Sequence, residues 1–150
     1  VKVAEEENVI LLLGTVMGMD SPCNASTPIV LTVDEVAGII EQIGSSYLAA
    51  YADTQVLSIR GESLTDWFDR LGEKVRLVRF TDGNYNGYRI WGKGVLPAEN
   101  LAEEIYRTGF NGLISFQIPG ERYCENPKDA QKQNHFRALS AWREVMDCQR

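Results

Sequence analysis

Four short apolar runs are spaced along the chain, and each leads into a segment with helical periodicity. The runs are Val9–Leu13, Leu48–Ala52, Val75–Phe80 and Leu113–Ile118. Successive residues in each run are apolar, which is typical of strands covered on both faces in a parallel sheet. This alternation, without a hairpin signal between the strands, predicts an α/β fold of four β-α units with right-handed crossovers.

Boundary signals mark the helices. Thr32 and Glu35 have capping-box spacing, and they predict a helix that runs to Ile43 and ends at Gly44. Three further helices are predicted over Ser63–Gly72, Pro97–Arg107 and Asn126–Met146. Several aromatic or apolar side chains at helical spacing are expected to face the core: Trp67, Phe68, Tyr106, Phe136 and Trp142. Residues 82–94 are rich in glycine and asparagine and predict a long loop.

Length and composition describe one globular domain spanning residues 1–150. The net charge of −6 argues against a nucleic-acid surface, and no apolar run is long enough to cross a bilayer. The odd cysteine count predicts a reduced, cytoplasmic protein, since Cys23, Cys124 and Cys148 have no close partners in sequence. The single histidine, His135, is expected to pack on a helix rather than to act as a base.

The ends of the four predicted strands define the candidate site. The residues at or just past these ends are Gly14, Asp53, Arg79 and Gln117. In a barrel of parallel strands, chemistry takes place at the carboxyl ends of the strands. One carboxylate among four such positions is too few for a tight metal site.

Much of the chain resembles the sugar isomerases and epimerases with a xylose-isomerase-like TIM barrel. The most specific piece is the Gly92-Lys93-Gly94 turn followed by Pro97 and a helix. Other matching segments are residues 10–16, 51–54, 67–76, 78–82, 89–97 and 108–117. The ketose 3-epimerase and fructoselysine-epimerase branch is the most similar, and the resemblance implies strands five to eight. We therefore expect a parallel (β/α)4 half of a TIM barrel.

The resemblance also assigns roles to the four strand ends. Such enzymes hold Mn²⁺ or Mg²⁺ with Glu, Asp, His and Glu on these strands, and the two glutamates move the proton. The corresponding residues here are Gly14, Asp53, Arg79 and Gln117. Glycine supplies no ligand, arginine keeps its proton and glutamine is a poor base. The resemblance thus implies a degenerate metal site without a cofactor, in which only Asp53 is a candidate residual ligand.

Several residues near these strand ends have two interpretations. Asp53 is a surviving ligand or, as we expect, a carboxylate paired with Arg79 on the adjacent strand. Asp82 caps the glycine-rich loop or takes part in catalysis, and we expect the cap. Arg89, Lys93 and the loop aromatic Trp91 are candidate sugar-binding residues, with Tyr88 and Arg122 nearby. For the charged members of this set, simple surface solvation is the alternative.

A half barrel leaves its inner face and both edge strands unpartnered. We expect closure by a homodimer; a companion N-terminal half or rearrangement into an open α/β sandwich are the alternatives. The predicted function is a non-catalytic module that binds a sugar or sugar phosphate, or serves in assembly. The alternative is a Mn²⁺- or Mg²⁺-dependent sugar isomerase or epimerase. It would be completed by a partner half or by replacement ligands such as Asp53, Asp82 and Glu121.

Overall fold

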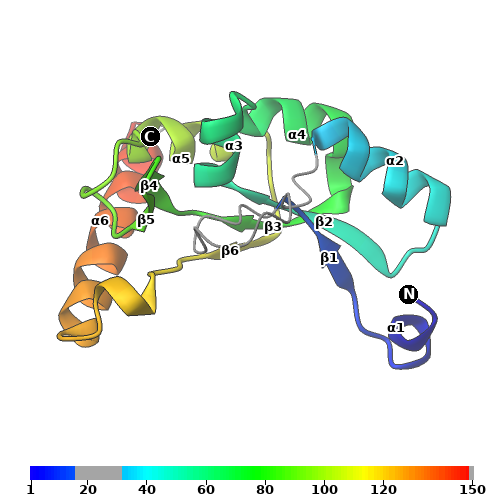
Figure 1. The fold of residues 1–150 in the computed structure, drawn as a ribbon. Coiled ribbons are helices and arrows are strands. Elements are labelled where there is room, and N and C mark those ends of the chain that lie inside the picture. The colour runs from blue at the N-terminus through cyan, green and yellow to red at the C-terminus, as the bar shows by residue number, and fades with distance from the viewer. Residues whose placement is uncertain (16–31, 149–150) are drawn as a thin grey trace.

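The fold is built on a four-stranded parallel sheet, as the sequence predicts. The computed structural model describes residues 1–15 and 32–148. The strand order is β1-β2-β3-β6, formed by residues Leu11–Leu13, Leu48–Asp53, Val75–Arg79 and Leu113–Ser115. Neighbouring strands pair in parallel throughout (Figure 1). This arrangement matches part of a TIM barrel and confirms the expected fold class.

Alternation along each strand separates a helix-facing side from an open side. In β2, Leu48, Ala50 and Ala52 belong to the hydrophobic core. Because successive side chains of a strand point to opposite faces, Tyr51 and Asp53 project from the other face. In β2, Tyr51 and Asp53 therefore lie on the face opposite the apolar core residues.

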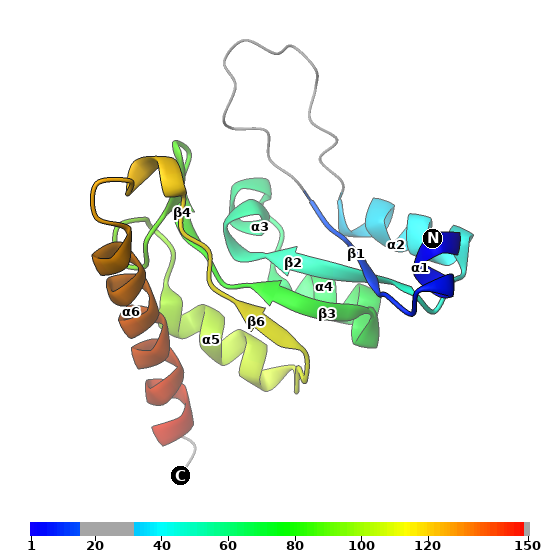
Figure 2. The same ribbon diagram turned by 90° about the horizontal axis from the view of Figure 1, so that it is seen from below.

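The main helices cover one face of the sheet (Figures 1 and 2). They are α2 (Val33–Ile43), α4 (Leu64–Leu71), α5 (Ala98–Arg107) and α6 (Pro127–Asp147). The Thr32–Glu35 capping box and the left-handed Gly44 at the end of α2 are both present, as predicted. Trp67 is fully buried under the sheet, but Phe136 and Tyr106 are 70% and 46% exposed. The expectation that these two rings face the core is wrong, because their positions on α6 and α5 turn them toward solvent.

Two parts of the fold depart from the prediction. Residues 54–60 form a helix, α3 (Thr54–Arg60), which begins directly after β2. The predicted loop at residues 82–94 contains an antiparallel hairpin of β4 (Asp82–Asn84) and β5 (Gly87–Arg89). A short helix α1 (Lys2–Glu6) precedes β1, and the 3-10 turns η1 (Gly72–Lys74) and η2 (Gly120–Arg122) complete the elements. Both departures follow the carboxyl end of a strand. Asp53 caps α3, and backbone pairing forms the hairpin although its residues are typical of a loop.

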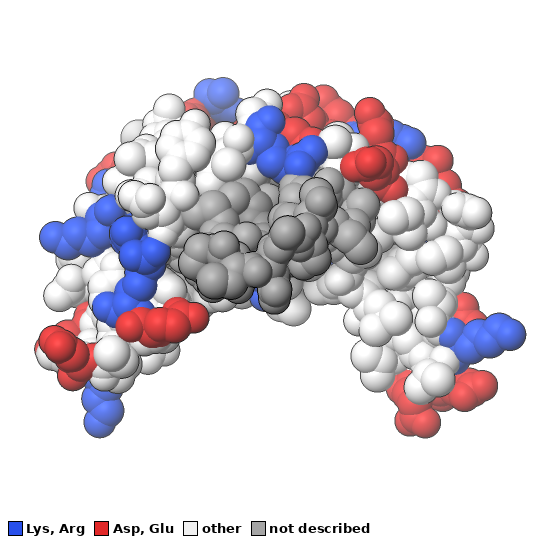
Figure 3. Space-filling model, in the orientation of Figure 1, with Lys and Arg blue, Asp and Glu red and all other residues white. Residues whose placement is uncertain are grey.

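The molecule is an arch whose hollow side is the open face of the sheet (Figure 3). Apolar side chains remain exposed at both edge strands, since Ile10 beside β1 is 45% exposed and Leu113 in β6 is 72% exposed. Charged side chains lie mainly over the helical side and the two ends of the arch. No helix in the described part of the chain is long and apolar enough to cross a membrane. Cys124 and Cys148 are exposed free thiols, and Cys23 lies outside the described residues.

Candidate functional site

The strand register brings the predicted site positions to one edge of the sheet. Asp53 in β2 lies opposite Arg79 in β3, and Arg79 lies opposite Ser115 in β6. Gly14 directly follows β1, and Gln117 lies two residues beyond the end of β6. The carboxyl ends of parallel strands thus gather these residues, as the sequence predicts.

Tyr51 fills the space beside Gly14. A Cβ atom added to Gly14 would lie 2.5 Å from Cζ and 2.6 Å from Cδ1 of the Tyr51 ring. The Tyr51 hydroxyl donates a hydrogen bond of 3.4 Å to the carbonyl oxygen of Thr15. Burial raises the pKa of the Tyr51 phenol. An aromatic ring therefore occupies the position toward which a metal-ligating side chain at residue 14 would extend.

Asp53 serves as the N-cap of α3. Its Oδ1 atom accepts hydrogen bonds from the backbone N–H groups of Gln55 and Val56, at 3.1 and 3.3 Å. The same oxygen accepts from the Thr81 hydroxyl at 2.8 Å, and Oδ2 accepts from the Tyr88 hydroxyl at 2.9 Å. The residue is 0% exposed. Both carboxylate oxygens are thus engaged by protein donors.

Burial sets the protonation behaviour of Asp53. Loss of water raises the pKa of this carboxyl, although the hydrogen bonds from Thr81 and Tyr88 act in the opposite direction. Burial and the neighbouring Asp53 carboxylate likewise raise the pKa of the Tyr88 phenol.

The predicted ion pair between Asp53 and Arg79 is wrong. Within the described residues the salt bridges of arginine involve Arg60, Arg70, Arg107 and Arg137, and Arg79 forms none. Instead, the Arg79 guanidinium lies 4.9 Å from the centre of the Tyr51 ring. Asp53 is drawn to the N-terminus of α3, and the cation stacks on an aromatic face.

The four strand-end residues do not fit a divalent metal ion. Gly14 has no donor atom, Arg79 is a cation, and Asp53 has both oxygens hydrogen-bonded. Gln117 contributes one neutral amide oxygen. In the chain outside residues 16–31 and 149–150, no three His, Cys, Asp or Glu side chains converge as a metal site. The donor set therefore provides neither the charge nor the oxygen ligands that Mn²⁺ and Mg²⁺ require.

Asp82 caps the glycine-rich segment, as expected from the sequence. Oδ1 accepts from the backbone N–H groups of Gly83 and Leu96, at 2.7 and 3.1 Å. Oδ2 accepts from Gly92 and Gly94, at 3.0 and 2.9 Å. Residue 94 must be glycine for this approach, since a Cβ atom there would collide with the Asp82 carboxylate. Asp82 is 1% exposed and organises the loop rather than a metal.

The predicted sugar-binding residues divide between a groove and the core. Arg89 and Lys93 line a groove of about 500 Å³ together with Tyr123 and the first turns of α6. Trp91, expected to be exposed, is only 4% exposed; it stacks on Phe80 with ring centres 4.4 Å apart. Its indole N–H donates to the Phe80 carbonyl oxygen, so it cannot stack on a sugar.

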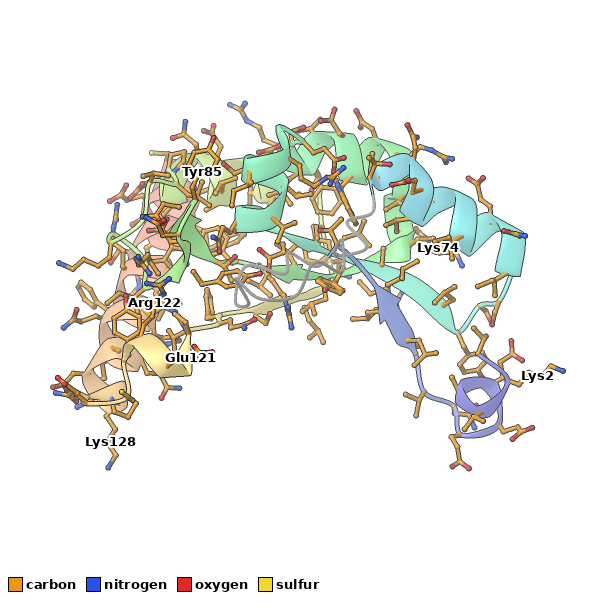
Figure 4. The ribbon with its side chains drawn as sticks, in the orientation of Figure 1. Lys2, Lys74, Tyr85, Glu121, Arg122 and Lys128 are labelled. Carbon is orange, nitrogen blue, oxygen red and sulfur yellow. The ribbon has the colours of Figure 1, made fainter. Side chains whose placement is uncertain are left out.

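Arg122 and Glu121 lie on η2 beside the hairpin (Figure 4). The Arg122 guanidinium donates a hydrogen bond to the carbonyl oxygen of Asn86. Both residues are exposed. Arg122 thus fastens the hairpin to the segment after β6, and Glu121 does not join Asp53 in a carboxylate cluster.

Two residues of the strand-end arrangement, Tyr51 and Thr81, were not identified as site residues from the sequence. Tyr88 was named as an aromatic near the sugar-binding candidates, but its hydroxyl binds Asp53. Tyr51 could have been found, because it lies two residues before Asp53 on the same strand and must share its face. Thr81 and Tyr88 reach Asp53 only because the chain turns into the hairpin after β3. Their part in the site depends on a turn that the residue pattern did not indicate.

Comparison with known proteins identifies the family to which this fold is similar. The family described as Xylose isomerase-like TIM barrel matches residues 1–142. Fructoselysine 3-epimerase of Escherichia coli O157:H7 is 26% identical over 131 residues, covering 82% of this chain and 47% of that protein. The Shigella flexneri fructoselysine 3-epimerase matches to the same extent.

Solved structures show the same fold. A D-tagatose 3-epimerase-like protein superposes with a TM-score of 0.73 at 17% identity, covering 99% of this chain and 52% of that one. The D-psicose 3-epimerase of Clostridium cellulolyticum H10 gives a TM-score of 0.62 at 18% identity, covering 97% and 51%. The chain thus spans about half the length of the relatives that it matches.

Proposed function

Because the chain belongs to the xylose isomerase-like TIM barrel family, we propose that it binds a sugar or sugar phosphate at its strand ends without metal-dependent catalysis. The observation that carries this proposal is the state of Asp53. Its two oxygens accept from Gln55, Val56, Thr81 and Tyr88, and the residue is fully buried. Protein donors therefore already hold this carboxylate in place, through the backbone N–H groups of α3 and the hydroxyls of Thr81 and Tyr88.

The neighbouring residues support the same proposal. Proton transfer beside a carbonyl needs a base near the reacting carbon and an acid or metal near the oxygen. Tyr51 has a raised pKa and Arg79 holds a fixed positive charge, so neither suits the role of base. Ser115, Gln117 and Arg79 are half-buried and offer hydrogen-bonding groups. These are groups for holding hydroxyls and oxyanions in place.

The open face of the sheet supports an accompanying proposal about assembly. Within the described residues, the edge strands β1 and β6 each pair with a parallel neighbour on one side only. Exposed apolar side chains flank both outer edges. A second copy related by a two-fold axis would pair β1 of each copy with β6 of the other and close an eight-stranded barrel. Every strand would then keep its parallel direction, and the strand ends of both copies would share one mouth.

The metal content of the purified chain tests the non-catalytic proposal directly. We expect less than one-tenth equivalent of Mn²⁺ or Mg²⁺ after dialysis, and no change in thermal midpoint when either ion is added. Sugars related to fructose and tagatose, and their phosphates, should raise the midpoint equally with and without EDTA. Ligand stabilisation that requires a divalent ion would contradict the proposal.

The metal-dependent epimerase remains the second candidate, because the relatives are about twice as long as this chain. A companion half would bring further residues to the same mouth. Mixing the chain with such a half and finding stoichiometric metal together with ketose epimerisation would favour that candidate. Activity of the chain alone would instead indicate replacement ligands on its own residues.

A further inference from the structure

We infer that the Arg79 guanidinium, held against the ring of Tyr51, is the recognition site for a carboxylate or phosphate group carried by the sugar. This inference rests on the proposed function and narrows it to an anionic ligand. The first support is the position of Arg79 in the sheet. Arg79 ends β3, an inner strand of the sheet, and lies between Asp53 on β2 and Ser115 on β6.

The hydrogen-bonding capacity of Arg79 is unused within the described residues. The hydrogen bonds and salt bridges of arginine side chains there involve Arg60, Arg70, Arg89, Arg107, Arg122 and Arg137, and Arg79 is not among them. The nearest carboxylate by strand register is Asp53, and its two oxygens already accept four hydrogen bonds. An added anion can therefore form charge-assisted hydrogen bonds with this half-buried guanidinium.

The guanidinium is also held in place before any ligand arrives. Its centre lies 4.9 Å above the Tyr51 ring, and that ring is seated in the space left by Gly14. Cation–π contact fixes the plane of the group while leaving its N–H donors available at the edge. A planar fork of donors matches the two oxygens of a carboxylate or of a phosphate. The Arg79 guanidinium is thus charged, oriented by the Tyr51 ring and partly buried, as an anion-binding group should be.

Polar groups of the next strand complete the site. Ser115 lies directly opposite Arg79, and Gln117 follows two residues later, beyond the end of β6. Both residues are half-buried. Their hydroxyl and amide groups can bind the sugar hydroxyls that flank an anionic group.

Titration calorimetry with matched pairs of ligands tests the inference. The pairs are glucuronate with glucose, and fructose 6-phosphate with fructose, each in EDTA. At least one anionic member should bind ten times or more tightly than its neutral counterpart, and which pair responds distinguishes carboxylate from phosphate. Equal binding of the neutral and anionic members would overturn the inference while leaving the proposed function standing.

Variants at Arg79 assign the effect to this side chain. Arg79→Gln should remove the anionic preference, so that the neutral and anionic members of each pair bind within about twofold of each other. Arg79→Lys keeps the charge but not the planar fork, so it should retain part of the preference. Arg143→Gln makes the same change at an exposed arginine on α6 and should bind like the unmodified chain. Circular dichroism confirms that each variant is folded. An unchanged anionic preference in folded Arg79→Gln would overturn the inference. If the unmodified chain binds none of the sugars, both the inference and the proposed function are overturned.

Discussion

The ring of Tyr51 lies where a side chain at residue 14 would have to go. Gly14 directly follows β1 and Tyr51 lies on the adjacent strand β2, and an added Cβ atom on Gly14 would lie 2.5 Å from Cζ of the ring. The same ring carries the Arg79 guanidinium on its face. Gly14, Tyr51 and Arg79 therefore form a single packing arrangement. The glycine leaves room for the ring, and the ring carries the cation.

Substitution of Gly14 tests that arrangement. Gly14→Ala should lower the free energy of unfolding by about 1–3 kcal/mol, because the added methyl overpacks against Tyr51. In the background of Tyr51→Ala the same change should cost much less, which urea unfolding of the double-mutant cycle would measure. Gly38→Ala is the matched control, since an added Cβ meets nothing within 4 Å in that helix. There we expect stabilisation of about 0.5–1 kcal/mol.

Equal costs for Gly14→Ala in the unmodified chain and in Tyr51→Ala would contradict the proposed contact between Gly14 and Tyr51.

Replacement of Asp82 tests the role of this carboxylate in the loop. Asp82→Ala would leave the backbone N–H groups of Gly83, Gly92, Gly94 and Leu96 without their acceptor. We expect a loss of about 3–5 kcal/mol in unfolding free energy, because the substitution removes four hydrogen bonds to a buried charged acceptor and leaves their donors partly shielded from water. Asp69→Ala, at an exposed position on α4, should change stability by less than about 0.5 kcal/mol. A small effect at Asp82 would show that the loop is held by other contacts.

The protonation of Asp53 gives a prediction about pH. Burial raises the pKa of this carboxyl above its ordinary value of 3.8. The folded chain therefore holds the proton of Asp53 more tightly than the unfolded chain does. This difference stabilises the fold fully below the unfolded-state pKa, and the stabilisation is lost as the pH rises through the folded-state pKa. Asn at this position still caps α3 through its amide oxygen but does not titrate.

Urea unfolding of the unmodified chain and of Asp53→Asn between pH 4 and 7 measures this difference. The stability advantage of the unmodified chain should shrink as the pH rises. Asp69→Asn provides the control for the change in net charge. An advantage that grows with pH would mean that the hydrogen bonds from Thr81 and Tyr88 outweigh burial.

The strands and most helices could be predicted from local pattern, because burial dictates both. Leu48, Ala50 and Ala52 are apolar since they face the helices, and Thr32 caps α2 through its own side chain. These signals act over a few residues. They explain why the order of elements and the convergence of Gly14, Asp53, Arg79 and Gln117 are present in the structure.

The interactions of the strand-end residues could not be predicted in the same way. Asp53 and Arg79 are cross-strand neighbours, and opposite charges there favour an ion pair. The backbone N–H groups of α3 and the hydroxyls of Thr81 and Tyr88 compete for the carboxylate and prevail. Trp91 likewise turns inward because Phe80 offers it a stacking partner and a carbonyl acceptor. Such outcomes depend on several long-range contacts at once.

Closure of the arch by a second copy gives the remaining prediction. Leu113 in the edge strand β6 is 72% exposed, and Ile10 beside the opposite edge is 45% exposed. In a two-fold assembly these edges meet, so the apolar side chains become buried at two equivalent seams. Light scattering after size-exclusion chromatography should give twice the chain mass of 16.8 kDa at micromolar concentration. Leu113→Asp should shift the chain to monomer, because it places a charge in each seam. Val95→Asp, at an exposed position 73% accessible to solvent on the segment before α5, should leave the dimer unchanged. A monomer for the unmodified chain would exclude a second copy and direct attention to a companion half barrel.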